Sequence, residues 1–162
     1  LCEMLRNALP EDQVTIRINS NGGLVSTGEQ IINAINESEA HVRGYIESSC
    51  GSMATMIFLA CNGWGISPHA EFFIHTTSGG MFGKESETYA QSVFVRKKTH
   101  KAINRCYAGF LSDAEITKVL EGTDIYFDSE EIIERLDRYV AYKRSSDADL
   151  EDLLATKKTL MS

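Results

Sequence analysis

The stretch HVRGYIESSCGSMATMIFLAC, residues 41–61, decides the fold class because its pattern changes at the middle. Residues 41–46 alternate in polarity, which predicts a strand. The small residues Ser48 to Ser52 predict a turn. Met53 to Cys61 are apolar on nearly every side, which predicts a centrally buried helix. The stretch is therefore typical of a strand followed by a helix that packs on it.

The same two patterns continue on both sides of this stretch. Alternation of strands with helices predicts an α/β domain with a mainly parallel sheet and packed helices. The remaining predicted elements are strands at Val14–Ile18 and Glu71–Ile74, and helices at residues 1–9, Leu24–Asn36, Lys84–Tyr107, Asp113–Leu120 (capped by Ser112) and Ser129–Asp137 (capped by Asp128).

Composition limits the class of protein. Of the 162 residues, 43% are apolar and 24% are charged, which predicts a folded chain rather than a disordered one. A net charge of −7 disfavours nucleic acid as a partner, because phosphate binding needs a basic face. No run of about 18 uncharged apolar residues occurs, so we expect no membrane-spanning helix. We expect one domain over residues 1–143 and a polar extension over residues 144–162.

The cysteines predict neither disulfides nor a metal site. They show no C-x-x-C spacing, and no cysteine is spaced from a histidine as a zinc site requires. Reduced thiols indicate a cytosolic compartment. The four cysteines are Cys2, Cys50, Cys61 and Cys106.

Turns at the carboxyl ends of the predicted strands hold the candidate site, because ligands of parallel sheets bind at that edge. Ser52 lies at a strand-to-helix turn, where helix N–H groups favour negative charge. It is either a nucleophile or a simple helix cap. His75 ends an apolar strand and is either a general base or a structural histidine. Asp124 precedes a capped helix and could orient an imidazole, although the pattern does not distinguish it from Asp113 or Asp128.

Four segments follow one another along the chain: Ile18-Asn19-Ser20-Asn21-Gly22-Gly23, Gly51-Ser52-Met53-Ala54, Phe73-Ile74-His75 and the loop around Asp124. In this order they resemble the Clp protease proteolytic-subunit (ClpP) family of serine peptidases. The similarity runs from about Pro10 to about Leu136 and is that of a divergent member of phage type. It implies a ClpP/crotonase-like fold, with a handle at about 77–107 that protrudes from the domain.

The resemblance also implies a role for each matched residue. Ser52 corresponds to the nucleophile, His75 to the base and Asp124 to the orienting acid. The backbone N–H groups of Gly23 and Met53 correspond to the oxyanion hole. An extended polypeptide would pair with the segments on either side of the nucleophile, and the implied substrate-binding residues are Gly22, Leu24, Val25, Thr77 and Ser78. No metal and no cofactor are implied.

The implied function is a serine endopeptidase that cleaves unfolded polypeptides inside a ring-shaped chamber in the cytoplasm of a bacterium or a phage-infected host. One heptameric ring or two stacked rings are expected, with an AAA+ unfoldase as a candidate partner. Thr15 and Arg17 stand where the family has ATPase-docking aromatic residues, and Gly122-Thr123 stands where it has a ring-bridging Asp-Arg pair. The alternatives are a non-catalytic ring or scaffold subunit and a CoA-binding enzyme of the crotonase type, which uses no Ser–His pair.

Overall fold

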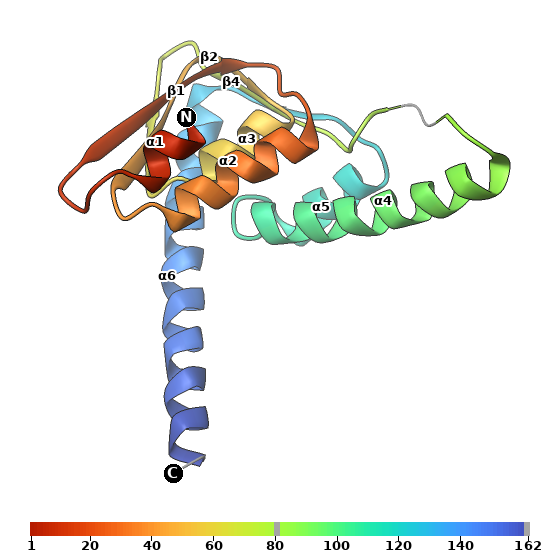
Figure 1. The fold of residues 1–162 in the computed structure, drawn as a ribbon. Coiled ribbons are helices and arrows are strands. Elements are labelled where there is room, and N and C mark those ends of the chain that lie inside the picture. The colour runs from red at the N-terminus through yellow and green to blue at the C-terminus, as the bar shows by residue number, and fades with distance from the viewer. Residues whose placement is uncertain (80–81, 161–162) are drawn as a thin grey trace.

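The computed structural model describes residues 1–79 and 82–160, and for residues 147–160 it describes the backbone alone. Figure 1 shows the arrangement of the elements. In chain order they are α1 (Cys2–Arg6), β1 (Gln13–Ser20), α2 (Val25–Glu37), β2 (His41–Gly51), α3 (Met53–Ala60), β3 (Gly63–Ile66), β4 (Glu71–Ile74), α4 (Glu85–Tyr107), α5 (Asp113–Leu120), β5 (Ile125–Phe127) and α6 (Ser129–Leu160).

Strand β2 organises the sheet. It pairs in parallel with β1 along most of its length, with β3 through residues 43–46 and with β4 through residues 49–51. The short strand β5 pairs antiparallel with β4 at the other edge. The predicted α/β class with a mainly parallel sheet is therefore confirmed.

The turn predicted over Ser48 to Ser52 is wrong for most of its length, because β2 continues to Gly51. Ser49, Cys50 and Gly51 pair with residues 71–73 of β4, and Cys50 also pairs with Ser20 of β1. Pairing with strands on both sides therefore outweighs the turn preference of these small residues. The chain therefore turns from β2 into α3 at the single residue Ser52.

Helices α1, α2 and α3 lie against one face of β1 and β2, as Figure 1 shows. Burial alternates along β2, where Val42, Gly44 and Ile46 are buried while Arg43 is exposed. The apolar helix α3 is mostly buried, as its composition predicted. The ring of its residue Phe58 packs edge-on against the ring of Phe72 in β4. The nucleophile candidate therefore lies at the start of a rigid, buried helix.

The second half of the chain adds α4, α5 and α6. Helix α4 matches the predicted handle helix, and among the described residues it buries only Ile103 and Tyr107. The segment of 75–79 that precedes it has no strand, and residues 80–81 of the predicted handle lie outside the described residues. Ser112 caps α5 through a capping box with Glu115, as predicted.

Helix α6 is longer than predicted. It begins at Ser129 with the expected cap, in which the Asp128 carboxylate accepts bonds from the N–H groups of Glu130 and Glu131. It then continues to Leu160 instead of ending at Asp137. No glycine or proline follows Gly122, so nothing in the covalent chain interrupts the helix. Figure 1 shows its carboxyl-terminal part projecting away from the other elements.

Candidate active site

Ser52 joins β2 to α3 in a backbone conformation that side chains rarely adopt. Its φ is 51° and its ψ is −125°, and among the described residues it is the one non-glycine residue with positive φ. Its N–H donates to the Phe73 carbonyl at 2.8 Å, while its carbonyl accepts from the Thr55 N–H at 3.0 Å. Strained residues of this kind concentrate at functional sites, because the surrounding structure must hold them in place.

The Ser52 side chain points to His75 rather than to its own helix. Ser52 Oγ lies 2.8 Å from His75 Nε2. Ser52 makes no side-chain capping bond to α3, so the alternative of a simple side-chain cap does not describe it. With the ring proton on Nδ1, Nε2 accepts the hydroxyl proton, which is the arrangement of a nucleophile and its general base.

His75 is oriented by the strand that it follows. It comes directly after β4, is partly buried, and its ring stacks on that of Phe73 with centroids 4.8 Å apart. Phe73 in turn stacks on Tyr126 of β5 at 4.6 Å. Because the Phe73 carbonyl also binds the Ser52 N–H, one stretch of β4 positions both members of the pair.

Two glycines let the loop after β1 reach the Ser52 turn. Gly22 has φ +105°, and a Cβ on it would lie 2.7 Å from Ser52 Cβ and 3.1 Å from the Met53 nitrogen. A Cβ on Gly51 would lie 3.1 Å from the Asn21 carbonyl oxygen. The Ser49 hydroxyl also donates to Asn21 Oδ1 at 2.8 Å. The loop therefore packs directly on the turn that carries Ser52.

An open groove of about 1220 Å³ runs past Ser52 and His75 between α2, α3 and α4. Glu29 of α2 and Lys98 of α4, both of which line it, form an ion pair of 2.7 Å. Apart from Gly22, the predicted oxyanion and substrate-binding residues all line this groove: Gly23, Leu24, Val25, Met53, Thr77 and Ser78. Residues from three separate turns therefore face one space beside the Ser–His pair.

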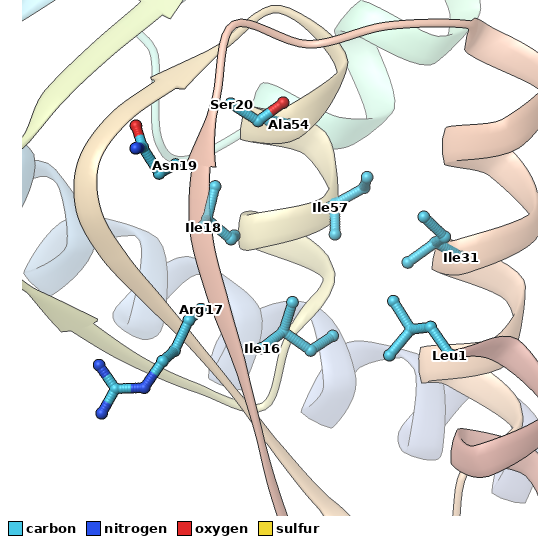
Figure 2. A pocket seen from close by; sticks show the side chains of 9 residues that line it. All are labelled: Leu1, Ile16, Arg17, Ile18, Asn19, Ser20, Ile31, Ala54 and Ile57. Carbon is cyan, nitrogen blue, oxygen red and sulfur yellow. The ribbon is translucent and has the colours of Figure 1, made fainter.

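A smaller pocket of about 170 Å³ lies between β1, α2 and α3, near Leu1 (Figure 2). Figure 2 shows Ile16, Ile18 and Ile57 directed into it, while Arg17 points away from it. It contains none of the predicted site residues.

Asp124 is not hydrogen-bonded to His75 in the structure, and its side chain is exposed. The β4–β5 ladder ends with Ile74 paired to Ile125, so His75 and Asp124 each directly adjoin its last pair in sequence. Of the two other acids that the sequence left open, Asp128 caps α6 and Asp113 is the first residue of α5.

Thr55 and Tyr107 were not predicted. The Thr55 hydroxyl is bonded both to the Ser52 carbonyl and to the Tyr107 hydroxyl, each at 2.6 Å. The available signal was a single polar residue within the otherwise apolar run Met53 to Cys61. Tyr107 is fully buried at the end of α4, and burial raises the pKa of its hydroxyl far above the ordinary value.

Among the side chains of residues 1–79 and 82–146, no group of three or more histidine, cysteine or acidic residues is placed to hold a metal ion. None of the described helices has the length and apolar character that crossing a membrane requires.

The fold and the candidate site together define a class: an α/β protein with a Ser–His pair at the carboxyl edge of a mainly parallel sheet. Residues 3–135 match the family described as Clp protease. That match covers most of the chain, so the chain belongs to the Clp protease family.

Two curated relatives illustrate the similarity. The ATP-dependent Clp protease proteolytic subunit 1 of Shouchella clausii (strain KSM-K16) is 33% identical in an alignment of 97 residues that covers 55% of this chain and 48% of that protein. The ATP-dependent Clp protease proteolytic subunit of Leuconostoc citreum (strain KM20) is 28% identical in an alignment of 120 residues that covers 71% of this chain and 58% of that protein. The matched parts thus span about half of the length of these relatives.

Proposed function

We propose that this chain is a serine-type endopeptidase subunit that cleaves unfolded polypeptides. The observation that carries the proposal is the 2.8 Å contact between Ser52 Oγ and His75 Nε2 at a strained strand-to-helix turn. Membership of the Clp protease family supports the same reaction class. A CoA-binding enzyme of the crotonase type would have no use for this pair.

The proposed reaction begins with attack of Ser52 Oγ on a peptide carbonyl while His75 takes its proton. The N–H groups of Gly23 and Met53 receive the negative charge that develops on the carbonyl oxygen. Met53 is the first residue of α3, so its N–H has no acceptor within the helix and lies at the positive end of the helix dipole. Each such donor contributes about 3 kcal/mol to the transition state. His75 then activates water to hydrolyse the acyl-enzyme.

Asp124 is proposed to orient His75 through Nδ1 and to stabilise its charged form. The ladder register supports this role, since its last pair joins Ile74 to Ile125, the immediate sequence neighbours of His75 and Asp124. Asp128 is already used as a helix cap and is the weaker choice. The role requires the Asp124 side chain to turn inward from its exposed position when substrate fills the groove.

Substrate is proposed to lie extended in the groove, between Gly22–Val25 on one side and Thr77–Ser78 on the other. Leu24 has an extended backbone, and Val25 begins α2, so the N–H groups of the first turn are available to a ligand. A groove that presents backbone groups on both sides favours an unfolded polypeptide over a folded protein.

Assembly into one heptameric ring or two stacked rings is also proposed, by similarity to the family. The exposed apolar side chains on α4, namely Tyr89, Val93 and Phe94, support a role for this helix in contacts between subunits. The relatives are named as ATP-dependent, and an AAA+ unfoldase acting in the cytoplasm is the corresponding proposed partner.

The decisive experiment is covalent labelling with a fluorophosphonate probe, read by intact mass and by the mass of the native assembly. We expect one label per subunit on Ser52, and loss of both labelling and peptide cleavage in Ser52→Ala. The control is Ser48→Ala, which removes an exposed hydroxyl from the same strand and should leave labelling unchanged. A wild-type assembly that is never labelled would favour a non-catalytic ring subunit instead.

A further inference from the structure

Apart from tyrosine hydroxyls and cysteine thiols, Thr55 carries the one polar side chain among the described residues that is fully buried, with 0% exposure. It lies in α3, where the other residues are apolar, and valine would fill the same volume without a hydroxyl to satisfy. Buried hydroxyl groups destabilise a fold unless they are hydrogen-bonded. The hydroxyl of Thr55 therefore calls for an explanation in terms of what it binds.

Its partners form a directed chain of hydrogen bonds. The Thr55 hydroxyl donates to the Ser52 carbonyl at 2.6 Å. A threonine hydroxyl has one proton, so the 2.6 Å contact with Tyr107 is a bond in which the tyrosine is the donor. The hydrogen bonds therefore run from Tyr107 to Thr55 and from Thr55 to Ser52. The side chains of Tyr107 and Thr55 are both buried.

The end of this chain is the strained residue of the candidate site. The Ser52 carbonyl receives two bonds from Thr55, one from the N–H at 3.0 Å and one from the hydroxyl. The Ser52 N–H is held on its other side by the Phe73 carbonyl at 2.8 Å. These bonds restrain the peptide groups on both sides of the Ser52 Cα, and so determine where Oγ points relative to His75.

From this geometry we propose that Thr55 and Tyr107 are positioning residues, which hold Ser52 in the conformation that directs Oγ to His75. The inference rests on the proposed function for its effect on rate, but the placement of Oγ is a property of the structure alone. Thr55 does not line the groove, and Tyr107, which does, has only 1% of its surface exposed. Loss of the chain should therefore lower the rate of the chemical step and leave substrate binding unchanged.

The main test compares Thr55→Val, Thr55→Ser and Tyr107→Phe in the full chain. We expect Thr55→Val to lower kcat and the rate of Ser52 labelling about fivefold, the factor that one hydrogen bond of ordinary net strength is worth. KM should stay within about twofold of the wild-type value. Thr55→Ser keeps the hydroxyl and should restore both rates. Tyr107→Phe should lower them about threefold, because Thr55 keeps its own bond to Ser52.

A matched control exists at the other end of the same helix. The Tyr139 hydroxyl donates to the Leu59 carbonyl at 3.2 Å, and this buried bond lies near the carboxyl end of α3, whereas Ser52 precedes its amino end. Tyr139→Phe removes the same atom as Tyr107→Phe. If the two variants lose thermal stability equally but only Tyr107→Phe slows labelling, positioning is supported. Equal slowing in both would overturn it in favour of a general structural role.

Crystal structures of the variants keep the inference testable if the peptidase proposal fails. In Thr55→Val the distance from Ser52 Oγ to His75 Nε2 should exceed 3.5 Å, beyond hydrogen-bonding range. In Thr55→Ser and Tyr139→Phe it should stay near the present 2.8 Å. A wild-type chain that takes no label would refute the proposed function only. An unchanged Ser52–His75 distance in Thr55→Val would refute the positioning role, whatever the activity.

Discussion

Replacing Gly22 with alanine tests whether the loop after β1 controls the candidate nucleophile. The new Cβ would lie 2.7 Å from Ser52 Cβ and 2.9 Å from the Gly51 carbonyl oxygen. Ordinary contact begins at 3.4 Å, so Ser52 or the loop must move by about 0.7 Å. The backbone of Gly22 also has φ +105°, where any side chain is strained.

Both effects can be given a magnitude. A non-glycine residue in this region costs about 1–3 kcal/mol, which for a domain of this size lowers Tm by several degrees, roughly 2–4 °C per kcal/mol. A shift approaching 1 Å at a reacting group costs about 100-fold in rate. We therefore expect Gly22→Ala to unfold at lower temperature and to slow labelling of Ser52 by about 10- to 100-fold.

The neighbouring glycine supplies the matched control. A Cβ on Gly23 would meet nothing within 4 Å, and its φ lies outside the positive region. Gly23→Ala also keeps the N–H that is proposed for the oxyanion hole. It should leave Tm within about 2 °C of wild type, since surface substitutions change stability by less than about 0.5 kcal/mol, and leave labelling nearly unchanged.

The two variants are compared by calorimetry and by the time course of fluorophosphonate labelling. If Gly22→Ala and Gly23→Ala label at the same rate, the contact between Gly22 and Ser52 does not control the nucleophile. If Ser52 is labelled more slowly in Gly23→Ala than in Gly22→Ala, then Gly23 rather than Gly22 is the glycine that the Ser52 turn requires.

Two further predictions concern stability and thiol chemistry. The hydrogen bond from Arg135 lowers the pKa of Glu115 from its ordinary 4.5 to about 2, so this pair stabilises the fold above about pH 5 and loses that effect as the pH falls towards 2. Glu115→Gln should cost about 2 kcal/mol at pH 7, with a smaller deficit at pH 3, as measured by denaturant unfolding; an equal deficit at both would contradict the ion pair. Burial raises the pKa of Cys61 to about 12 and raises the pKa of Cys50 further. Iodoacetamide should therefore modify both thiols only when the protein unfolds, whereas the partly exposed Cys2 should react in the native protein. Modification of Cys50 in the native protein, detected by mass spectrometry, would refute this.

Much of the fold could be predicted because the strand and helix patterns in the first half are local. The predicted strand Val14–Ile18 and helix Leu24–Asn36 lie within two residues of β1 and α2 at each end. The short strands β3 and β5 were not predicted. Each has only three or four residues, and they become strands through pairing with β2 and β4 rather than through a pattern of their own.

The pairing of Ser52 with His75 could also be expected from the sequence. Both follow strands that are neighbours in a parallel arrangement, and β2 and β4 do pair in parallel at residues 49–51 and 71–73. Parallel neighbours bring their carboxyl ends to one edge, so the two side chains meet there. The backbone strain at Ser52 and its bond to Thr55 could not be predicted, because they depend on where β2 ends and on the distant residue Tyr107.

Asp124 shows where reasoning from parallel strands stops. An acid that precedes a strand would lie at the opposite edge of a wholly parallel sheet, far from Ser52. Because β5 runs antiparallel to β4, its amino end lies at the carboxyl end of β4, where Ile125 pairs with Ile74. The role proposed for Asp124 therefore depends on the antiparallel direction of this three-residue strand. If Asp124→Asn leaves the pH dependence of Ser52 labelling unaltered, this direction has no catalytic consequence, and His75 acts without an orienting carboxylate.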